Sequence, residues 1–184
     1  MRLSISHTTR YTFKEPVIHA LQRLRLTPKE TQGQEILDWQ MTYENAEPEL
    51  QYEDQHHNTV NLVSVKPDSR LVTVTCTGTV RTRDEAGVIG RHSGHLPLWS
   101  FLGQTKLTRP GEKMKALVDE LGDPAGDKLG YLHNLSRLIA EKVNYEVGTT
   151  GVDTTAEDAV IAGSGVCQDH AHIFIGAARA RNIP

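Results

Sequence analysis

Hydrophobic and polar residues alternate along the first half of the chain, a pattern typical of β-strands with one buried face. β-Branched and aromatic residues are frequent in these segments, which favours strands over helices. Turn-forming clusters at 27–29, 47–49 and 66–69 separate them. Short strands joined by such turns predict an antiparallel sheet, arranged as a sandwich-like domain over residues 1–83. The six predicted strands lie near residues 3–8, 10–13, 21–26, 36–43, 59–65 and 70–82.

After residue 95 the apolar residues recur at the three- and four-residue steps of amphipathic helices. Residues 84–95 are rich in glycine and lack periodicity, so we expect a linker there. The chain is therefore predicted to have an α+β fold, with the helical part over 96–184. Helices are predicted at 96–102, at 112–121, at 127–143, from 154 or 155 to 163, and from 166 or 167 onward.

Two of these helices have a recognisable inner face, and one has a recognisable start. In the segment Thr154-Thr155-Ala156-Glu157-Asp158, a threonine with an acidic residue three positions later can form a capping box at the start of the fourth helix. The apolar face of the third helix is predicted to consist of Leu132, Leu135, Leu138, Ile139 and Val143. The inner face of the last helix is predicted to consist of Ala171, Phe174, Ile175 and Ala178.

Composition excludes some classes of protein. The chain has 184 residues, 23% of them charged, with a formal net charge of -3, so no basic excess points to nucleic acid or to an anionic membrane. No apolar run approaches the roughly 18 residues of a membrane-spanning helix, and the N-terminus lacks the apolar centre of a secretory signal. The two cysteines, Cys76 and Cys167, are far apart and do not indicate a disulfide framework. We therefore expect a cytoplasmic protein without a cofactor.

Cys167 is the strongest candidate for chemistry. It follows the glycine-rich turn Gly163-Ser164-Gly165 and opens the last predicted helix. The backbone N–H groups and the positive dipole end of a helix N-terminus favour a thiolate over a thiol. The same N–H groups could stabilise an oxyanion during covalent acyl transfer. A lone helical cysteine is more often a small buried residue, but this position favours a nucleophile.

A metal site is a competing interpretation, because Cys167, Asp169, His170 and His172 lie within six residues. On one helix, however, side chains share a face only at steps of three and four. Cys167 could then meet His170, and Asp169 could meet His172, but all four could not surround one ion. We therefore expect no metal.

The neighbouring polar residues have open roles. His170 could act as a local base for Cys167, but in cysteine hydrolases the imidazole normally comes from a distant segment and faces the sulfur across a cleft. It could equally be a solvated or packing histidine. Asp169 and His172 could hold the residues of the site in position, or they could be ordinary polar residues of the helix. Tyr145, at the end of the long helix, lies either near the site or in the core.

Two segments resemble a known family. Residues 145–159 (YEVGTTGVDTTAEDA) and 165–172 (GVCQDHAH) are similar to the bacterial transglutaminase-like family of the papain-like superfamily. Near the N-terminus, SHTTRYTF at 6–13 and LRLTP at 24–28 are similar to the β-rich domain that precedes the catalytic core in these proteins. The resemblance covers nearly the whole chain.

The resemblance implies that Cys167 is a nucleophile that attacks an amide carbonyl and forms a thioester. It also implies a catalytic His and Asp on strands that follow the helix ending near residues 182–184. We therefore expect a truncated chain that has only the helical half of the core and little or no amidase activity. The apolar face of the last helix would then be exposed, or covered by a second copy of the chain.

The resemblance leaves the reaction open among peptidase, amidase and acyltransferase, with a peptide or protein amide as substrate. The alternative is a non-catalytic protein-interaction module with a vestigial cysteine core.

Overall fold

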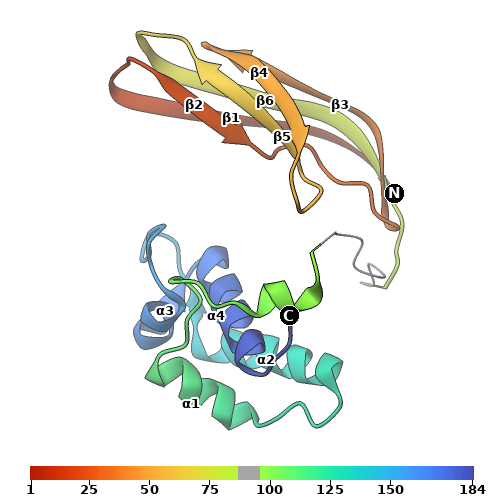
Figure 1. The fold of residues 1–184 in the computed structure, drawn as a ribbon, viewed down its shortest axis with the longest axis vertical. Helices are drawn as coiled ribbons and strands as arrows, with labels where there is room; N and C mark the ends of the chain where they lie inside the picture. Colours follow the sequence, from red (N-terminus) through yellow and green to blue (C-terminus); the bar gives the residue numbers. More distant parts are fainter. Residues whose placement is uncertain (87–95) are drawn as a thin grey trace. The chain divides into compact units, whose positions relative to one another are not determined.

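The computed structural model describes residues 1–86 and 96–184 (Figure 1). Its backbone contacts divide the chain into an N-terminal unit, Met1–Leu96, and a C-terminal unit, Pro97–Pro184. Long strands build the first unit and helices build most of the second, which confirms the α+β class. The linker expected at 84–95 falls mostly on residues 87–95, which lie outside the described residues.

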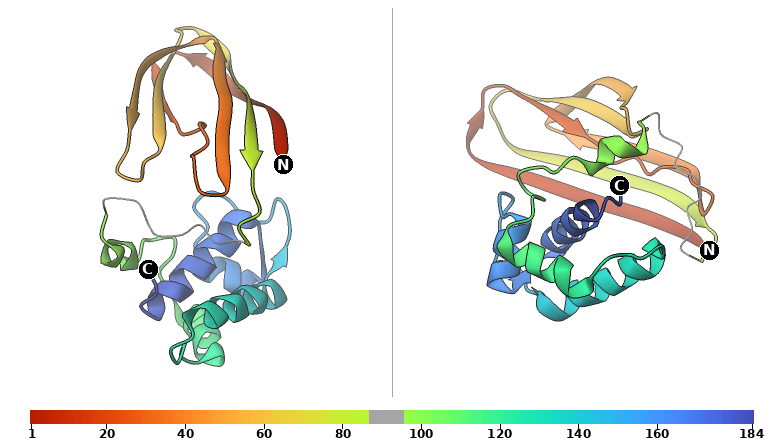
Figure 2. Two further views of the ribbon diagram at one scale, coloured as in Figure 1. Left: turned by 90° about the vertical axis from the view of Figure 1, so that its right-hand side faces the viewer. Right: turned by 60° about the horizontal axis from the view of Figure 1, so that its bottom comes forward.

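Two three-stranded antiparallel sheets form the N-terminal unit (Figures 1 and 2). One has the order β1-β6-β3 and the other the order β2-β5-β4, so β6 and β5 are the central strands. This arrangement confirms the predicted antiparallel, sandwich-like domain. The strands are β1 (Arg2–Val17), β2 (Ala20–Leu24), β3 (Gln34–Glu44), β4 (Ala46–Glu53), β5 (Thr59–Val65) and β6 (Ser69–Thr82).

The core of the N-terminal unit lies between the two sheets, because alternate side chains of each strand point to the same face. Val63 and Val65 of β5 are buried in one cluster with Val72, Val74 and Cys76 of β6. These residues are two positions apart within each strand. The alternation seen in the sequence is therefore the alternation between core and surface.

The first strand is longer than predicted. The two strands predicted at 3–8 and 10–13 are one continuous strand, β1, whose pairing with β6 runs without interruption from Arg2 to Thr12. Thr9, between the two predicted strands, pairs with Val74. A threonine favours extended backbone, so nothing at this position breaks the ladder.

Strand β4 was not predicted from the sequence, because it contains a proline. The turn predicted at 47–49 is wrong, because Pro48 lies inside β4 and pairs with Val63. The register against β5 shifts between Pro48 and Leu50. A proline is tolerated at an irregularity of an edge strand, where its missing N–H is not needed by a second neighbour.

The C-terminal unit packs four α-helices around an apolar core. Met114 of α1, Leu135 of α2 and Ile173 of α4 are fully buried in it. The helix predicted at 112–121 is found with those bounds, whereas the helix predicted at 96–102 is a short 3-10 helix, η1. None of the helices in the described residues is long and apolar enough to span a membrane. The helices are η1 (Leu98–Leu102), α1 (Glu112–Leu121), α2 (Lys128–Lys142), α3 (Ala156–Ala162) and α4 (Cys167–Ala180).

The helix-end signals in the sequence correspond to caps. Asp127 accepts a hydrogen bond from the Gly130 N–H at 2.9 Å and caps α2. The capping box predicted for α3 is confirmed, because Asp158 N–H donates to Thr155 Oγ1 and Thr155 N–H donates to Asp158 Oδ2, both at 3.2 Å. Helix α3 ends at Gly163, whose φ of 66° is a left-handed conformation that glycine adopts without strain.

The predicted inner face of α2 is largely confirmed, but that of α4 is partly wrong. In α4, Ala178 is buried as predicted and Phe174 is half-buried, whereas Ala171 and Ile175 are exposed. Because α4 is apolar on most sides, its sequence pattern does not fix which side turns inward. The buried apolar positions of α4 are Ile173, Gly176, Ala177 and Ala178.

Gly176 explains why this side of α4 faces the core. A Cβ atom at this position would lie 2.1 Å from the carbonyl oxygen of Thr108, in the segment before α1. This side of α4 therefore lies closer to that segment than any side chain would allow. Gln104 Nε2 also donates to the Gly176 carbonyl at 3.0 Å. A glycine within an alanine-rich run therefore marks the inward side of the helix.

Candidate functional site

A short parallel β-pair positions the start of α4. Strand β7 (Asn144–Tyr145) follows α2 and pairs with β8 (Ser164–Gly165), which precedes α4. Asn144 N–H donates to the Gly163 carbonyl at 2.8 Å, and Glu146 N–H donates to the Gly165 carbonyl at 2.9 Å. The segment after α2 and the turn before Cys167 are thereby held together.

Cys167 is the first residue of α4, and its side chain is exposed. The residue before it, Val166, is the N-cap and provides no side-chain acceptor for the first turn. The N–H groups of a first helical turn have no carbonyl partner within the helix, so they point out beside the sulfur. The structure thus places an accessible thiol next to backbone N–H groups that have no carbonyl partner within the helix.

Asp169 is the buried anchor of this helix start. Its Oδ2 accepts the Val166 N–H at 2.8 Å and the Thr150 hydroxyl at 2.6 Å, and its side chain is 0% exposed. Its Oδ1 has no hydrogen-bond partner in the part of the chain that the structure describes. A Cβ at Gly165 would lie 2.8 Å from the Asp169 Cβ, so only glycine fits at position 165.

The His170 ring bridges two backbone carbonyls. Nδ1 lies 2.9 Å from the Val166 oxygen, and Nε2 lies 3.0 Å from the Val143 oxygen, at the end of α2. A neutral imidazole can donate to only one of these carbonyls, whereas an imidazolium donates to both. Because both ring nitrogens already face oxygen atoms, neither is directed at the Cys167 sulfur.

Tyr145 lies beside His170, with ring centroids 6.2 Å apart and a tilt of 36°. The tyrosine is 65% exposed, so it belongs to the surface near α4 and not to the core. His172 is half-buried on α4, and its Nδ1 is a buried atom without a partner among the described residues. Of the sequence candidates, the structure thus brings Tyr145 and His170 together.

Several ligand types on one helix do not form a metal centre. No three His, Cys, Asp or Glu side chains are grouped to hold an ion within residues 1–86 and 96–184. Cys167 is exposed, Asp169 is buried, and His170 faces carbonyl oxygens. The side chains near Cys167 are therefore arranged for packing and hydrogen bonding.

Two residues of the site carry no clear signal in the sequence. Thr150 is one threonine among several in the segment before α3, yet it holds Asp169. Gln168 Nε2 donates to the Val152 carbonyl at 3.4 Å, which fixes the same segment beside α4. A run of Gly and Thr residues preceding a cysteine motif could have suggested a packed loop, but not which hydroxyl reaches the carboxylate.

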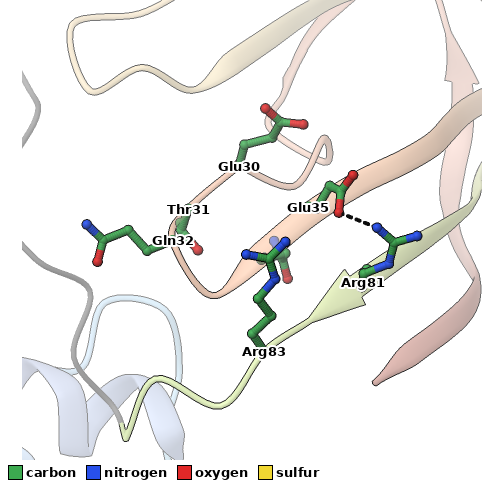
Figure 3. A pocket seen from close by; sticks show the side chains of 7 residues that line it. Glu30, Thr31, Gln32, Glu35, Arg81 and Arg83 are labelled. Carbon is green, nitrogen blue, oxygen red and sulfur yellow. Dashed lines mark hydrogen bonds and ion pairs between the residues drawn. The ribbon is translucent and has the colours of Figure 1, made fainter.

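The second thiol and the charged cavity of the N-terminal unit offer no comparable site. Cys76 is 2% exposed, and burial raises the pKa of its thiol. A cavity in the same unit has a volume of about 190 Å³, and Arg81 Nη1 donates to Glu35 there at 2.7 Å. Figure 3 shows the side chains that line it. Arg83 and Glu30 add one further charge of each sign. The lining of this cavity therefore has balanced charge and includes no thiol or imidazole.

Comparison with known proteins gives matches to both units. The bacterial transglutaminase-like N-terminal region matches residues 3–81, and the transglutaminase-like superfamily matches residues 115–184. An uncharacterized protein of Mycobacterium leprae (strain TN) is 24% identical over 195 residues, covering 100% of this chain and 68% of that protein.

A solved structure shares the fold. The crystal structure of a "putative cysteine protease" from Cytophaga hutchinsonii matches with a TM-score of 0.76 at 21% identity, over 100% of this chain. The chain spans 65% of the length of that protein. The first family match lies in the β-rich unit, and the second contains Cys167 in the helical unit. Residues 3–81 therefore match the bacterial transglutaminase-like N-terminal region, and residues 115–184, which include Cys167, match the transglutaminase-like superfamily.

Proposed function

We propose that Cys167 is the nucleophile of a cysteine enzyme that acts on amide bonds, as a peptidase, an amidase or an acyltransferase. The sulfur attacks the amide carbonyl, the C–N bond breaks, and the amine leaves with a proton. A thioester then holds the acyl group until water or a second amine displaces the sulfur. The substrate is a peptide or protein amide.

The observation that carries this proposal is the exposed Cys167 thiol at the first position of α4. A carbonyl that approached the sulfur would bring its oxygen toward the N–H groups of the first helical turn, which have no carbonyl partner within the helix. Those groups, including the N–H of Cys167 itself, could donate to the developing oxyanion. Exposed apolar side chains near this helix start, Tyr145 at 65% and Val152 at 78%, support contact with a peptide.

The base in this proposal is not His170. Its two ring nitrogens face the carbonyls of Val143 and Val166, and no hydrogen bond joins a histidine ring to Cys167 within the described residues. We assign His170 to positioning, because it ties the end of α2 to the start of α4. As the family resemblance implies, the imidazole that accepts the thiol proton would come from a segment outside residues 1–184.

Acylation by an activated ester tests the nucleophile separately from its base. Nitrophenyl acetate should transfer one acetyl group to the native chain, and peptide mapping should locate it on Cys167. A C167S variant should acquire no acetyl group at this position. Under this proposal, iodoacetamide at pH 6 should also alkylate Cys167 faster than it alkylates glutathione, since a catalytic thiol is more reactive than a free one.

Peptide amides should behave differently from the ester. Because no hydrogen bond joins a histidine ring to Cys167 within the described residues, we expect the 184-residue chain to hydrolyse them little or not at all. Turnover that C167S abolishes would contradict the proposed origin of the base. A Cys167 that is neither acylated nor alkylated faster than glutathione would instead favour the non-catalytic interaction module.

The compartment is part of the same proposal. Cys76 and Cys167 are both free thiols, and they lie in different units. Free thiols persist in a reducing environment, so we place the protein in the cytoplasm. An oxidised Cys167 in protein isolated from cells under thiol-blocking conditions would argue for another compartment.

A further inference from the structure

A cleft in the N-terminal unit has a lining suited to a small ligand and contains no part of the cysteine site. Its volume is about 250 Å³. It opens where the edge strands β3 and β4 of the two sheets lie on the same side of the unit. Both sheets contribute to the lining, with the segment after β2. The lining residues are Thr27, Trp39, Met41, Tyr43, Gln51 and Asn61.

Two N–H donors in this cleft have no partner among the described residues. Trp39 Nε1 and Asn61 Nδ2 are both buried atoms without a hydrogen bond. Asn61 is only 6% exposed, and its Oδ1 accepts a hydrogen bond from Gln51 Nε2 at 3.0 Å. That bond orients the amide and leaves the NH₂ group unused. Because buried polar groups are nearly always hydrogen-bonded, an acceptor is expected in this cleft.

The aromatic wall of the cleft is held by the backbone. The pairing of β3 with β6 shifts between Ile36 and Asp38, and the next residue, Trp39, pairs with Gly78. A Cβ at Gly78 would lie 2.5 Å from Trp39 Cε3, so the indole ring lies directly against the glycine backbone. A bulge beside a glycine therefore sets the position of the ring before any ligand arrives.

The rest of the wall is apolar or neutral. Tyr43 Oη donates to Met41 Sδ at 3.9 Å, and burial raises the pKa of Tyr43, so the phenol stays uncharged at neutral pH. None of the lining side chains is an acid, a lysine, an arginine or a histidine. A charged ligand would lose its water here without gaining a counter-ion, so the lining favours an uncharged one.

We propose that this cleft binds a small, uncharged aromatic molecule that carries a carbonyl acceptor. The ring would pack against Trp39 and Met41, and the carbonyl would accept from the Trp39 indole or the Asn61 amide. The cleft is smaller than the roughly 300–1,000 Å³ of sites for drug-sized ligands, so the ligand is a single substituted ring.

The indole N–H resonance of Trp39 reports directly on this contact. The chain has two tryptophans, so Trp99→Phe leaves a single indole signal. Benzamide, which combines a ring with a carbonyl, should shift that signal saturably at millimolar concentration. Toluene, which has the ring but no acceptor, should bind more weakly and leave the N–H shift nearly unchanged.

A second variant tests the amide donor. N61L in the Trp99→Phe background should weaken benzamide binding roughly three- to tenfold, the effect of one lost hydrogen bond, while toluene binding is unchanged or stronger. If N61L does not fold, the comparison of the two probes on the parent chain still decides. An unsaturable benzamide shift, no shift, or equal responses to both probes would show that the cleft holds only water.

Discussion

The Thr150 hydroxyl donates a hydrogen bond to Oδ2 of the buried Asp169 carboxylate, at 2.6 Å. The same oxygen accepts the backbone N–H of Val166, directly before Cys167. One carboxylate oxygen therefore joins the segment before α3 to the first turn of α4. The site at Cys167 depends on a polar contact between residues 19 positions apart.

Removing either partner should loosen this helix start. D169A leaves the Val166 N–H and the Thr150 hydroxyl without their acceptor, so we expect a loss of about 1–3 kcal/mol in the free energy of unfolding. T150V should cost less, because Val166 still satisfies the carboxylate in part. Urea denaturation followed by circular dichroism gives both values.

T150S is the matched control, because it keeps the hydroxyl and should stay within about 0.5 kcal/mol of the parent chain. In the double variant T150V/D169A, the two losses should not add, since the contact is lost only once. Additive losses would show that Thr150 and Asp169 act independently.

The sequence predicts that Cys167 begins a helix, but not the contacts that hold this helix start in place. A cysteine after Gly163-Ser164-Gly165 predicts a helix N-terminus, and α4 begins at Cys167. The partner of Asp169 is set by tertiary packing, and several threonines between residues 149 and 155 could equally have filled that role. Likewise, the contacts of His170 with two carbonyls depend on how α2 ends beside α4.

Glu157 caps a helix to which it does not belong. From α3, its carboxylate accepts the backbone N–H groups of Gly111 at 3.0 Å, Lys113 at 2.8 Å and Met114 at 3.0 Å, all at the start of α1. A negative charge at a helix N-terminus is stabilising. E157Q should therefore lower the free energy of unfolding by about 1 kcal/mol, and E157A by about 2 kcal/mol, in urea denaturation.

Glu112 provides the control for this cap. It is the acidic residue of the first turn of α1 and is exposed. E112Q removes the same charge without removing an acceptor, so it should cost at most about 0.5 kcal/mol. Equal losses from E112Q and E157Q would mean that charge alone, and not the three hydrogen bonds, stabilises α1.

Gly176 should not tolerate alanine. Glycine to alanine in a helix interior usually stabilises by about 0.5–1 kcal/mol. Here the new Cβ would lie 2.1 Å from the Thr108 oxygen and 2.9 Å from Met114 Cε, so we expect G176A to destabilise the chain by about 1–3 kcal/mol. Thermal unfolding should show a lower midpoint.

Gly103 is the matching open position. Its φ of -64° suits any residue, and a Cβ there would meet no atom within 4 Å. G103A should therefore be neutral or slightly stabilising. A G176A variant as stable as G103A would show that α4 can shift away from Thr108 at little cost.

The two cysteines should differ sharply toward a thiol reagent. Cys167 is exposed, whereas Cys76 is only 2% exposed between the sheets. Cys76 therefore reacts only when the structure around it opens locally. Iodoacetamide should therefore modify the native chain once, at Cys167, at least about a hundredfold faster than at Cys76. Intact-mass measurements over time follow both events.

Single variants assign these events. C76S should keep the fast modification, and C167S should lose it. In urea, both cysteines of the parent chain should react at similar rates, because the protection of Cys76 depends on folding. Fast modification of Cys76 under native conditions would show that the sandwich opens more readily than its buried core suggests.

The strand pattern predicts the N-terminal core well because the apolar alternate residues of the central strands β5 and β6 face the space between the sheets. Val72, Val74 and Cys76 alternate as expected. Prediction fails at Pro48, where local chemistry indicates a turn but pairing with Val63 of β5 keeps the chain extended. The prediction that Ile175 lies on the inner face of α4 is also wrong. Apolar residues lie on several sides of α4, so their spacing alone does not show which side is buried.

Asp54 should make the stability of the N-terminal unit depend on acid pH. Hydrogen bonds from the Asn58 side chain, then from Arg25 and from the backbone of Asn58 and His56, hold the pKa of Asp54 well below its usual range. A carboxyl group whose pKa is lower in the folded state stabilises the fold above its unfolded pKa, about 3.9. That contribution is lost as the pH falls toward the folded value. D54N should therefore destabilise the chain more at pH 6 than at pH 3, and the difference should grow as the pH falls further toward the folded pKa.

Asn58 tests the cause of this pH dependence. N58A removes the largest of the interactions that lower the Asp54 pKa, so the pKa should rise toward its usual value. The fall in unfolding free energy between pH 6 and pH 3, measured in urea, should then be smaller than in the parent chain but larger than in D54N. A D54N chain that loses as much stability on acidification as the parent would mean that other carboxylates govern the acid response, since the slope of stability against pH counts only protons bound differently by the folded and unfolded states.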